Sequence, residues 1–211
     1  MGALNMSNSF HSMGGSSSDE DIGPSEYSLE EIFQSNHIVQ DVQISNARTL
    51  RVLKEPENLL KVLKFISDPH YVNSREDRIK VYTEEEICKF FKYPYIAHQI
   101  FELQHHVINT LVVQSEDHLK QLFSFLEKMD GKKFTMNQSM PQFYVKSMTT
   151  FLKEFYTPMV KHVMNQENDE ILRSMLMNVE VADMHTLILK LLGFDSHEES
   201  IMDGWRDMLI G

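Results

Sequence analysis

The chain has 211 residues, of which 42% are hydrophobic and 24% are charged, close to the averages for globular domains. These values exclude a wholly disordered or collagen-like chain, and the 8 glycines and 6 prolines argue against a loop-rich β-sandwich. The 14 methionines and 13 phenylalanines, with 1 tryptophan, favour a helical protein, because methionine tolerates helices and fills irregular gaps in a core.

The charge is acidic and unevenly distributed. The chain carries 20 basic and 31 acidic residues, a net charge of -11. Residues 1–47 contain no lysine or arginine and contribute -7 of that charge. Non-specific nucleic-acid binding needs clustered basic side chains, and anionic lipid surfaces repel an acidic chain. We therefore expect neither a nucleic acid nor a membrane as partner.

Cysteine usage and the N-terminus indicate the compartment. Cys88 is the single cysteine, so a disulfide framework and a cysteine-based zinc site are excluded. The N-terminus lacks the basic and apolar regions of a signal peptide, and no aliphatic run approaches the ~20 residues of a membrane span. We expect a cytoplasmic protein, with the nucleus as a second location.

Residues 1–26 form a tail rich in serine, asparagine and glycine, with an acidic patch. Its apolar residues are too few to offset the entropy of ordering, so we expect disorder there. Ser17 and Ser18 precede the acidic patch. That pattern suits an acid-directed kinase and equally suits a solubilising tail. Residues 27–211 are expected to form one helical domain.

Helix signals follow one another from Ser28 onward. Ser28 and Glu31 form a capping box, and the apolar pattern continues at helical spacing to Val42. Further helices are predicted over 47–54, over 56–67, from a second capping box at 83–86, over 96–103, over 106–113, from Ser115 to a stop at Gly131, over 140–156, 158–165 and 169–178, over 180–192 with a stop at Gly193, and over 198–210. The sequence Tyr93-Pro94-Tyr95 is expected to break the run and start the next helix.

No segment shows sustained apolar and polar alternation of period two, so no strand is predicted. Helices arrive at intervals of about 18–22 residues, and helix pairs about 40 residues apart match the period of HEAT and armadillo arrays. We therefore predict an all-α right-handed helical-repeat solenoid. Its expected core includes Leu60, Leu63, Ile100, Phe123, Leu126, Leu187 and Leu191.

Residues that could carry chemistry are scattered. There is no phosphate-binding glycine loop and no nucleophile elbow. Cys88 lies in a predicted helix beside apolar residues, and Glu84, Glu85 and Glu86 disfavour a thiolate there. We interpret Cys88 as a packing residue.

The sequence Glu102-x-x-His105 has the spacing of di-iron bundle ligands, but no second such motif is present. A solvated or helix-end pair, His105 and His106, is the favoured interpretation. His197 beside Glu198 and Glu199 is interpreted as a helix N-terminus rather than an acid/base pair.

A lysine-rich segment, Lys61-Val-Leu-Lys-Phe65, faintly resembles a short phosphatase-docking motif with one residue too many, and its apolar residues are expected to be buried. Together with the residues above, this leaves no predicted catalytic, cofactor or metal residue. We expect a protein that is not an enzyme.

Several motifs occur in a fixed order along the helical region. They are SLEEIFQSNHIVQDVQ at 28–43, NARTLRVL at 46–53, PENL at 56–59, FKYPYIA at 91–97, LKQLFSFL at 119–126, ADMHTLILK at 182–190 and Gly204-Trp205. Their order and spacing resemble the SAPS domain, found in phosphatase-associated regulatory subunits of type-6-like serine/threonine phosphatases. The resemblance covers residues 28–210.

The chain also departs from the family pattern. His98-Gln99 stands where the family has Cys-Glu, and a different connector follows Met129. The family domain continues for several more helix pairs, so this chain resembles its N-terminal third to half. Apolar residues in 198–210 would then lie at an uncovered end, and we expect another chain to cover them or that end to be mobile and to self-associate.

The resemblance implies a scaffold that holds a phosphatase catalytic subunit and selects its substrates, without catalytic residues or a cofactor. It allows ankyrin-repeat or other scaffold proteins as further partners. The sequence leaves the partner-binding residues unknown. A helical-repeat adaptor that does not bind a phosphatase, for example a truncated paralogue, is the alternative that stays open.

Overall fold

The structure, a computed structural model, describes residues 27–68, 82–128, 139–165, 169–178 and 182–193. Within these ranges every regular element is a helix and none is a strand, which confirms the expected all-α class for this part of the chain. The predictions for residues 1–26, for the stop at Gly131 and for a helix over 198–210 lie outside the described residues.

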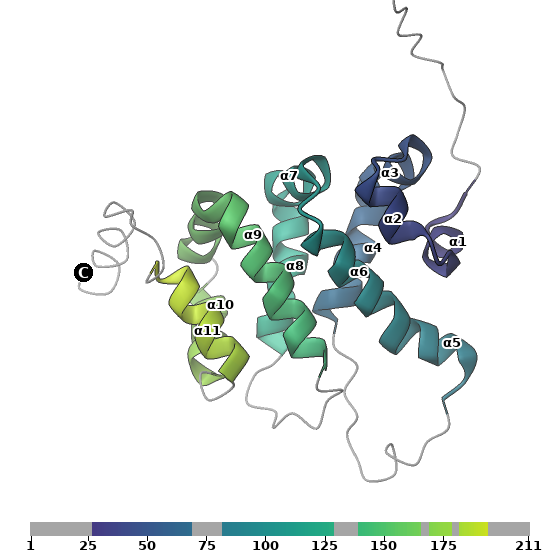
Figure 1. The fold of residues 1–211 in the computed structure, drawn as a ribbon. Helices are drawn as coiled ribbons and strands as arrows, with labels where there is room; N and C mark the ends of the chain where they lie inside the picture. Colours follow the sequence, from purple (N-terminus) through teal and green to yellow (C-terminus); the bar gives the residue numbers. More distant parts are fainter. Residues whose placement is uncertain (1–26, 69–81, 129–138, 166–168, 179–181, 194–211) are drawn as a thin grey trace, which may run out of the picture.

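Four short helices form the N-terminal part of the fold (Figure 1). They are α1 (Leu29–Gln34), α2 (Ile38–Gln43), α3 (Ala47–Lys54) and α4 (Pro56–Ser67). The predicted capping box of α1 is confirmed, because the Glu31 amide donates to Ser28 Oγ at 3.2 Å and the Ser28 amide donates to Glu31 Oε2 at 2.7 Å. Pro56 begins α4 as predicted, at a position where its missing N–H leaves no helical hydrogen bond unmade.

The middle of the fold is a nearly unbroken series of helical segments. They are α5 (Glu84–Ile87), the π-helix η1 (Cys88–Lys92), α6 (Tyr93–Glu102), α7 (His106–Gln114) and α8 (Glu116–Lys128). Thr83 and Glu86 form the second predicted capping box. Ser115 Oγ accepts from the His118 amide at 3.4 Å and so caps α8. A helix starts at Tyr93-Pro94-Tyr95 as predicted, because α6 begins at Tyr93 with Pro94 in its first turn. The break predicted before it is wrong, because the π-helical turn joins α5 to α6 without interruption.

Three helices complete the described fold. They are α9 (Ser139–Met164), α10 (Asp169–Met177) and α11 (Ala182–Leu191). The two helices predicted over 140–156 and 158–165 are one helix with a kink at Phe155, whose φ of -131° and ψ of 45° are not helical. Pro158 explains the kink, because it cannot donate to the Glu154 carbonyl and its ring crowds that group. Gly193 follows α11 with φ 76°, as expected of a helix stop.

Helices that are distant in the sequence pack against one another. The main pairs are α4 with α8, α4 with α6, α6 with α9, and α9 with α11. Figure 1 shows that these pairs follow in order from the α1–α4 end of the molecule to the α10–α11 end. The central helices α4, α6, α8 and α9 each pack against more than one neighbour.

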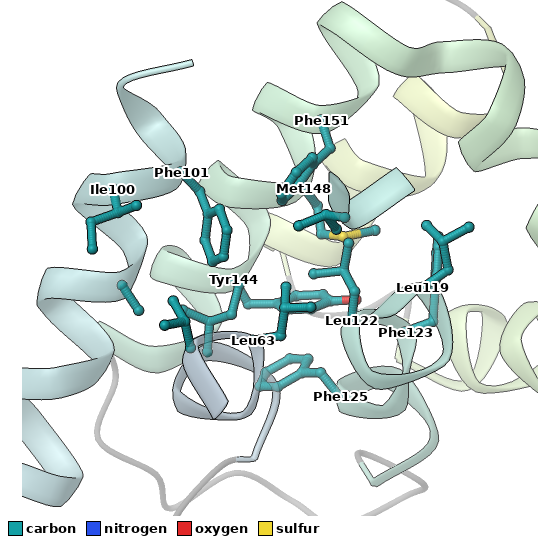
Figure 2. Close-up of a cluster of buried hydrophobic side chains, with 14 of the residues drawn as sticks. Leu63, Ile100, Phe101, Leu119, Leu122, Phe123, Phe125, Tyr144, Met148 and Phe151 are labelled. Carbon is teal, nitrogen blue, oxygen red and sulfur yellow. The ribbon is translucent and has the colours of Figure 1, made fainter. Parts of the chain in front are cut away.

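The core lies where α4, α6, α8 and α9 meet, and Figure 2 shows its side chains pointing toward one another. Six of the predicted core residues are buried, namely Leu63, Ile100, Phe123, Leu126, Leu187 and Leu191. Leu60 is the exception, because it is only partly buried. The stripe of α4 that faces the core is formed by Leu59, Val62, Leu63 and Ile66, and Leu60 lies on the flank of that stripe.

Phe123 provides a test of this core. Its side chain has no exposed surface, so we expect Phe123→Ala to lower the free energy of unfolding by about 3–5 kcal/mol through lost burial and an unfilled cavity. Denaturant unfolding measures this change. A loss below about 1 kcal/mol would contradict full burial of the ring.

Tyr144 provides the opposite test. It is fully buried and stacks on Phe125 at 4.1 Å, and its hydroxyl has no hydrogen-bond partner among the described residues. Burial raises the pKa of the Tyr144 phenol well above its usual range, and the charge of Glu127 adds to this.

We expect Tyr144→Phe to keep the packing and remove the unsatisfied hydroxyl, which should raise the free energy of unfolding by about 1 kcal/mol. Denaturant unfolding of the two proteins side by side measures this difference. A clear loss of stability would mean that the hydroxyl is hydrogen-bonded in solution.

Candidate functional site

The residues that the sequence singled out for chemistry do not assemble into one site. Glu102 Oε2 lies 3.4 Å from His98 Nε2, whereas His105 Nε2 lies 3.3 Å from Ser45 Oγ on the α2–α3 turn. In the described ranges, no group of three or more histidine, cysteine, aspartate or glutamate side chains is placed to hold a metal ion. The segment around His197 and residues Ser17 and Ser18 lie outside the described residues.

The apolar residues of the segment Lys61–Phe65 face the core, as the sequence predicts, whereas Lys61 and Lys64 are exposed. Val62 has no exposed surface, and the ring of Phe65 lies 5.2 Å from those of Phe33 and Tyr93. The segment does not present its apolar residues as a linear motif would. Cys88 is half-buried in the π-helix.

One polar cluster lies at the kink of α9 and was not predicted. His106 Nδ1 lies 2.8 Å from Glu154 Oε1, and Asn109 Nδ2 donates to Glu154 Oε2 at 3.3 Å. The His106 ring also stacks on Phe155 at 6.1 Å. These contacts connect the start of α7 to the kinked segment of α9. The sequence could not indicate them, because the partners are more than forty residues apart and no local pattern joins them.

Two further histidines are buried between helices. His98 Nδ1 lies 3.2 Å from Ser147 Oγ, joining α6 to α9. His162 Nδ1 lies 3.3 Å from Glu116 Oε1, joining α9 to α8. Burial lowers the pKa of His98 and of His162 below the ordinary histidine value, although Glu102 and Glu116 respectively oppose the shift. Both rings therefore favour the neutral form in the folded protein.

The most distinctive surface feature is the arm, which we define as residues 84–95, comprising α5, the π-helix and the start of α6. Pro94 accounts for its unusual geometry. It has no N–H to donate to the Phe90 carbonyl four residues earlier, and its ring would clash with that carbonyl in an α-helix. The turn widens instead, and the Tyr93 amide donates to the Cys88 carbonyl five residues earlier. Such π-helical turns are rare and frequently lie at functional sites.

The base of the arm is firmly attached to the body. The Tyr93 ring lies 5.5 Å from Phe33 of α1 and 5.2 Å from Phe65 of α4, and these two rings also contact each other. Lys92 Nζ donates to the Gln34 carbonyl at 3.1 Å. Aromatic contacts of this kind contribute about 0.5–1.5 kcal/mol beyond their area, so the direction of the arm is fixed at its base.

Beyond its base, the arm projects from the body (Figure 1). The contacts of α5 are chiefly with the π-helix, and those of the π-helix are chiefly with α5 and α6. Neither α5 nor the π-helix contains a buried residue. The arm therefore presents to solvent the side chains of Glu84, Glu85, Ile87, Lys89, Phe91 and Tyr95.

Three large apolar side chains lie along one side of the arm, and we call them the exposed stripe. Ile87 is 48% exposed, Phe91 38% and Tyr95 47%. They are spaced four residues apart, which keeps them on one face of a helix. Tyr82 packs its ring 5.5 Å from that of Phe91. The exposed stripe is the candidate interaction surface of the protein.

The sequence did not reveal this stripe. The local pattern favours packing for Cys88 and a break at Pro94, which would place Ile87 and Tyr95 in different helices. A signal was present, because apolar residues at 87, 91 and 95 keep a four-residue spacing straight through the proline.

Comparisons with known proteins give no identification, because no family model, curated protein or solved structure matches the chain. Among the described helices, none combines the length and the apolar character that crossing a bilayer requires.

The buried histidines predict how stability depends on pH. Because the pKa values of His98 and His162 are lower in the folded than in the unfolded chain, the unfolded chain binds more protons as the pH falls below about 6.5. Their contribution to stability is complete above that pH and is lost progressively below it.

We expect the wild type to lose stability between pH 7.5 and 5.5, and His98→Gln/His162→Gln to lose less over the same interval. Denaturant unfolding at each pH measures the two slopes. His185→Gln, at an exposed position of α11, is the control and should keep the wild-type slope. Equal slopes for the wild type and the double variant would contradict the attribution of this pH dependence to His98 and His162.

Proposed function

We propose that the chain is a non-catalytic regulatory or scaffold subunit that binds the catalytic subunit of a type-6-like serine/threonine phosphatase and modulates its targeting. In this proposal the helices form part of a right-handed armadillo/HEAT-like solenoid, in which each helix pair covers the next. The support comes from where the SAPS-like motifs lie in the fold.

Several of those motifs include helix starts or junctions, whereas Leu119–Leu126 lies within α8. Ser28 caps α1, Pro56 begins α4, and Tyr93-Pro94 joins the π-helix to α6. Residues in such positions specify helix boundaries and the angle between helices, rather than a reaction. This is what a scaffold needs, because a scaffold acts by holding a surface in a defined shape. The placement of the motifs is the observation that carries the proposal.

The packing is compatible with a helical array. Helices are added in succession along the fold, as α4 pairs with α8, α6 with α9 and α9 with α11. The exposed stripe lies at one side of the body that these helices form. Exposed apolar side chains gathered along one helix face of an acidic protein favour a protein-binding surface.

The alternative is a helical-repeat adaptor that does not bind a phosphatase. The exposed stripe favours protein binding in general and carries no chemical preference for a phosphatase, so it is equally compatible with this second function.

Direct binding separates the two functions. We expect the purified chain to bind a purified type-6-like phosphatase catalytic subunit saturably, with one copy per subunit, and to bind a type-1-like catalytic subunit much more weakly. Biolayer interferometry at physiological salt measures both affinities. The adaptor alternative predicts no binding to either catalytic subunit.

A further inference from the structure

We infer that the arm is a helical docking element, and that its exposed stripe enters an apolar groove with a basic rim on the partner. This inference rests on the proposed function, and the partner is accordingly the phosphatase catalytic subunit.

The energetics of the arm point to an external partner. No residue of α5 or the π-helix is fully buried, and Cys88 and Phe90 are only partly covered, whereas a short helix in water is marginal without packing of an apolar face. The capping box of Thr83 and Glu86 and the continuity with α6 hold the arm in helical form. A pre-formed helix loses little entropy on binding.

The spacing of the exposed stripe matches one mode of recognition. A helix that lies in a groove uses anchors three or four residues apart along one face. Ile87, Phe91 and Tyr95 meet this spacing, and two of them are aromatic, as is typical of residues that dominate binding energy. Tyr95 is held by Gln99 Nε2, which donates to its hydroxyl at 3.0 Å, and by Phe143, whose ring lies 5.7 Å away.

The charge of the arm specifies the rim of the groove. Glu84 and Glu85 are exposed at the tip, and neither forms an ion pair with a described residue. Glu86 is engaged in the capping box, and Lys92 donates to the Gln34 carbonyl at the base. Lys89 lies with its Nζ 5.9 Å from the centre of the Phe90 ring. Two uncompensated carboxylates beside an apolar stripe are complementary to lysines or arginines on the partner.

A second copy of this chain suits the arm less well. A two-fold pairing would bring together two chains that each carry a net charge of -11, and their mutual repulsion opposes association. Dimer formation through the arm is accordingly an outcome that would overturn the inference.

The decisive experiment removes the apolar anchors. We expect Ile87→Ser/Phe91→Ser to weaken binding to the type-6-like catalytic subunit at least about thirtyfold, as for residues at the centre of an interface. The matched control is Ile44→Ser/Val107→Ser, which removes two apolar side chains that are 72% and 42% exposed elsewhere on the molecule. The control should bind like the wild type.

A second pair of variants tests the charge. We expect Glu84→Lys/Glu85→Lys to slow association about tenfold at low salt and to reduce the salt dependence of the rate. The control is Glu57→Lys/Glu170→Lys, which reverses two acidic residues that also lie in the first turns of helices. The control should leave the rate and its salt dependence near those of the wild type.

The outcomes distinguish this inference from the proposed function. If the wild type binds and the arm variants bind equally well, or if arm and control variants weaken alike, the docking arm is wrong and the proposed function stands. If the wild type does not bind the catalytic subunit, or if sedimentation shows that it dimerises through the arm, the inference is overturned; absence of binding overturns the proposed function as well.

Hydrogen exchange on the wild type covers the case in which a variant fails to fold. We expect amides of residues 84–95 to gain protection when the catalytic subunit is added. Unchanged exchange across the arm, with binding detected, would overturn the inference without any substitution.

Discussion

The structure depends on the mutual burial of short helices. Most of the described helices are too short to be stable alone in water, so outside the arm they depend on another helix to cover their apolar stripes. The place where α4, α6, α8 and α9 meet satisfies this requirement for four helices at once. Rings there interlock, with Phe101 and Phe151 5.3 Å apart and Phe125 and Tyr144 4.1 Å apart. Helices outside this centre, including α1 and α11, are stabilised through their contacts with it or with its neighbours.

Two prolines give this helical body its irregular features. Pro94 and Pro158 each remove one backbone hydrogen bond and crowd a carbonyl, yet neither ends its helix. Burial on both sides of Pro158, and at Pro94 the burial of α6 together with the packing of Tyr93, stabilise the helix more than the lost bond destabilises it. The backbone departs from α-helical geometry locally, in a π-helical turn before Pro94 and in a kink at Phe155. The arm and the polar cluster around Glu154 lie at these two places, so the irregularities and the candidate sites have the same cause.

This explains how much could be predicted from the sequence. Local signals act over a few residues, and they gave the all-α class, both capping boxes, the start of α4 at Pro56 and the stop at Gly193. Local signals also gave six of the seven predicted core residues. At the seventh position the prediction was wrong by one residue, because Leu59 faces the core and Leu60 lies beside it. What escaped prediction depends on distant neighbours. The local rule for proline predicts a break at Pro94, whereas the packing of Tyr93 against Phe33 and Phe65 keeps the chain helical.

The candidate site was missed for a related reason. An apolar stripe on a helix is the ordinary sign of a core-facing side, and nothing in Ile87, Phe91 and Tyr95 distinguishes a stripe facing solvent from one facing the core. Only the three-dimensional arrangement decides, because Tyr93 and Lys92 attach the base of the arm to α1 and α4 and thereby turn the opposite side outward. The same contacts that anchor the arm thus expose the stripe. A rotation of the arm about its own axis could bury the exposed stripe against the body. The same rotation would separate the Tyr93 ring from Phe33 and Phe65, so the packing at the base opposes it. The exposure of the stripe is therefore maintained by the packing of the body, as a surface for binding another protein requires.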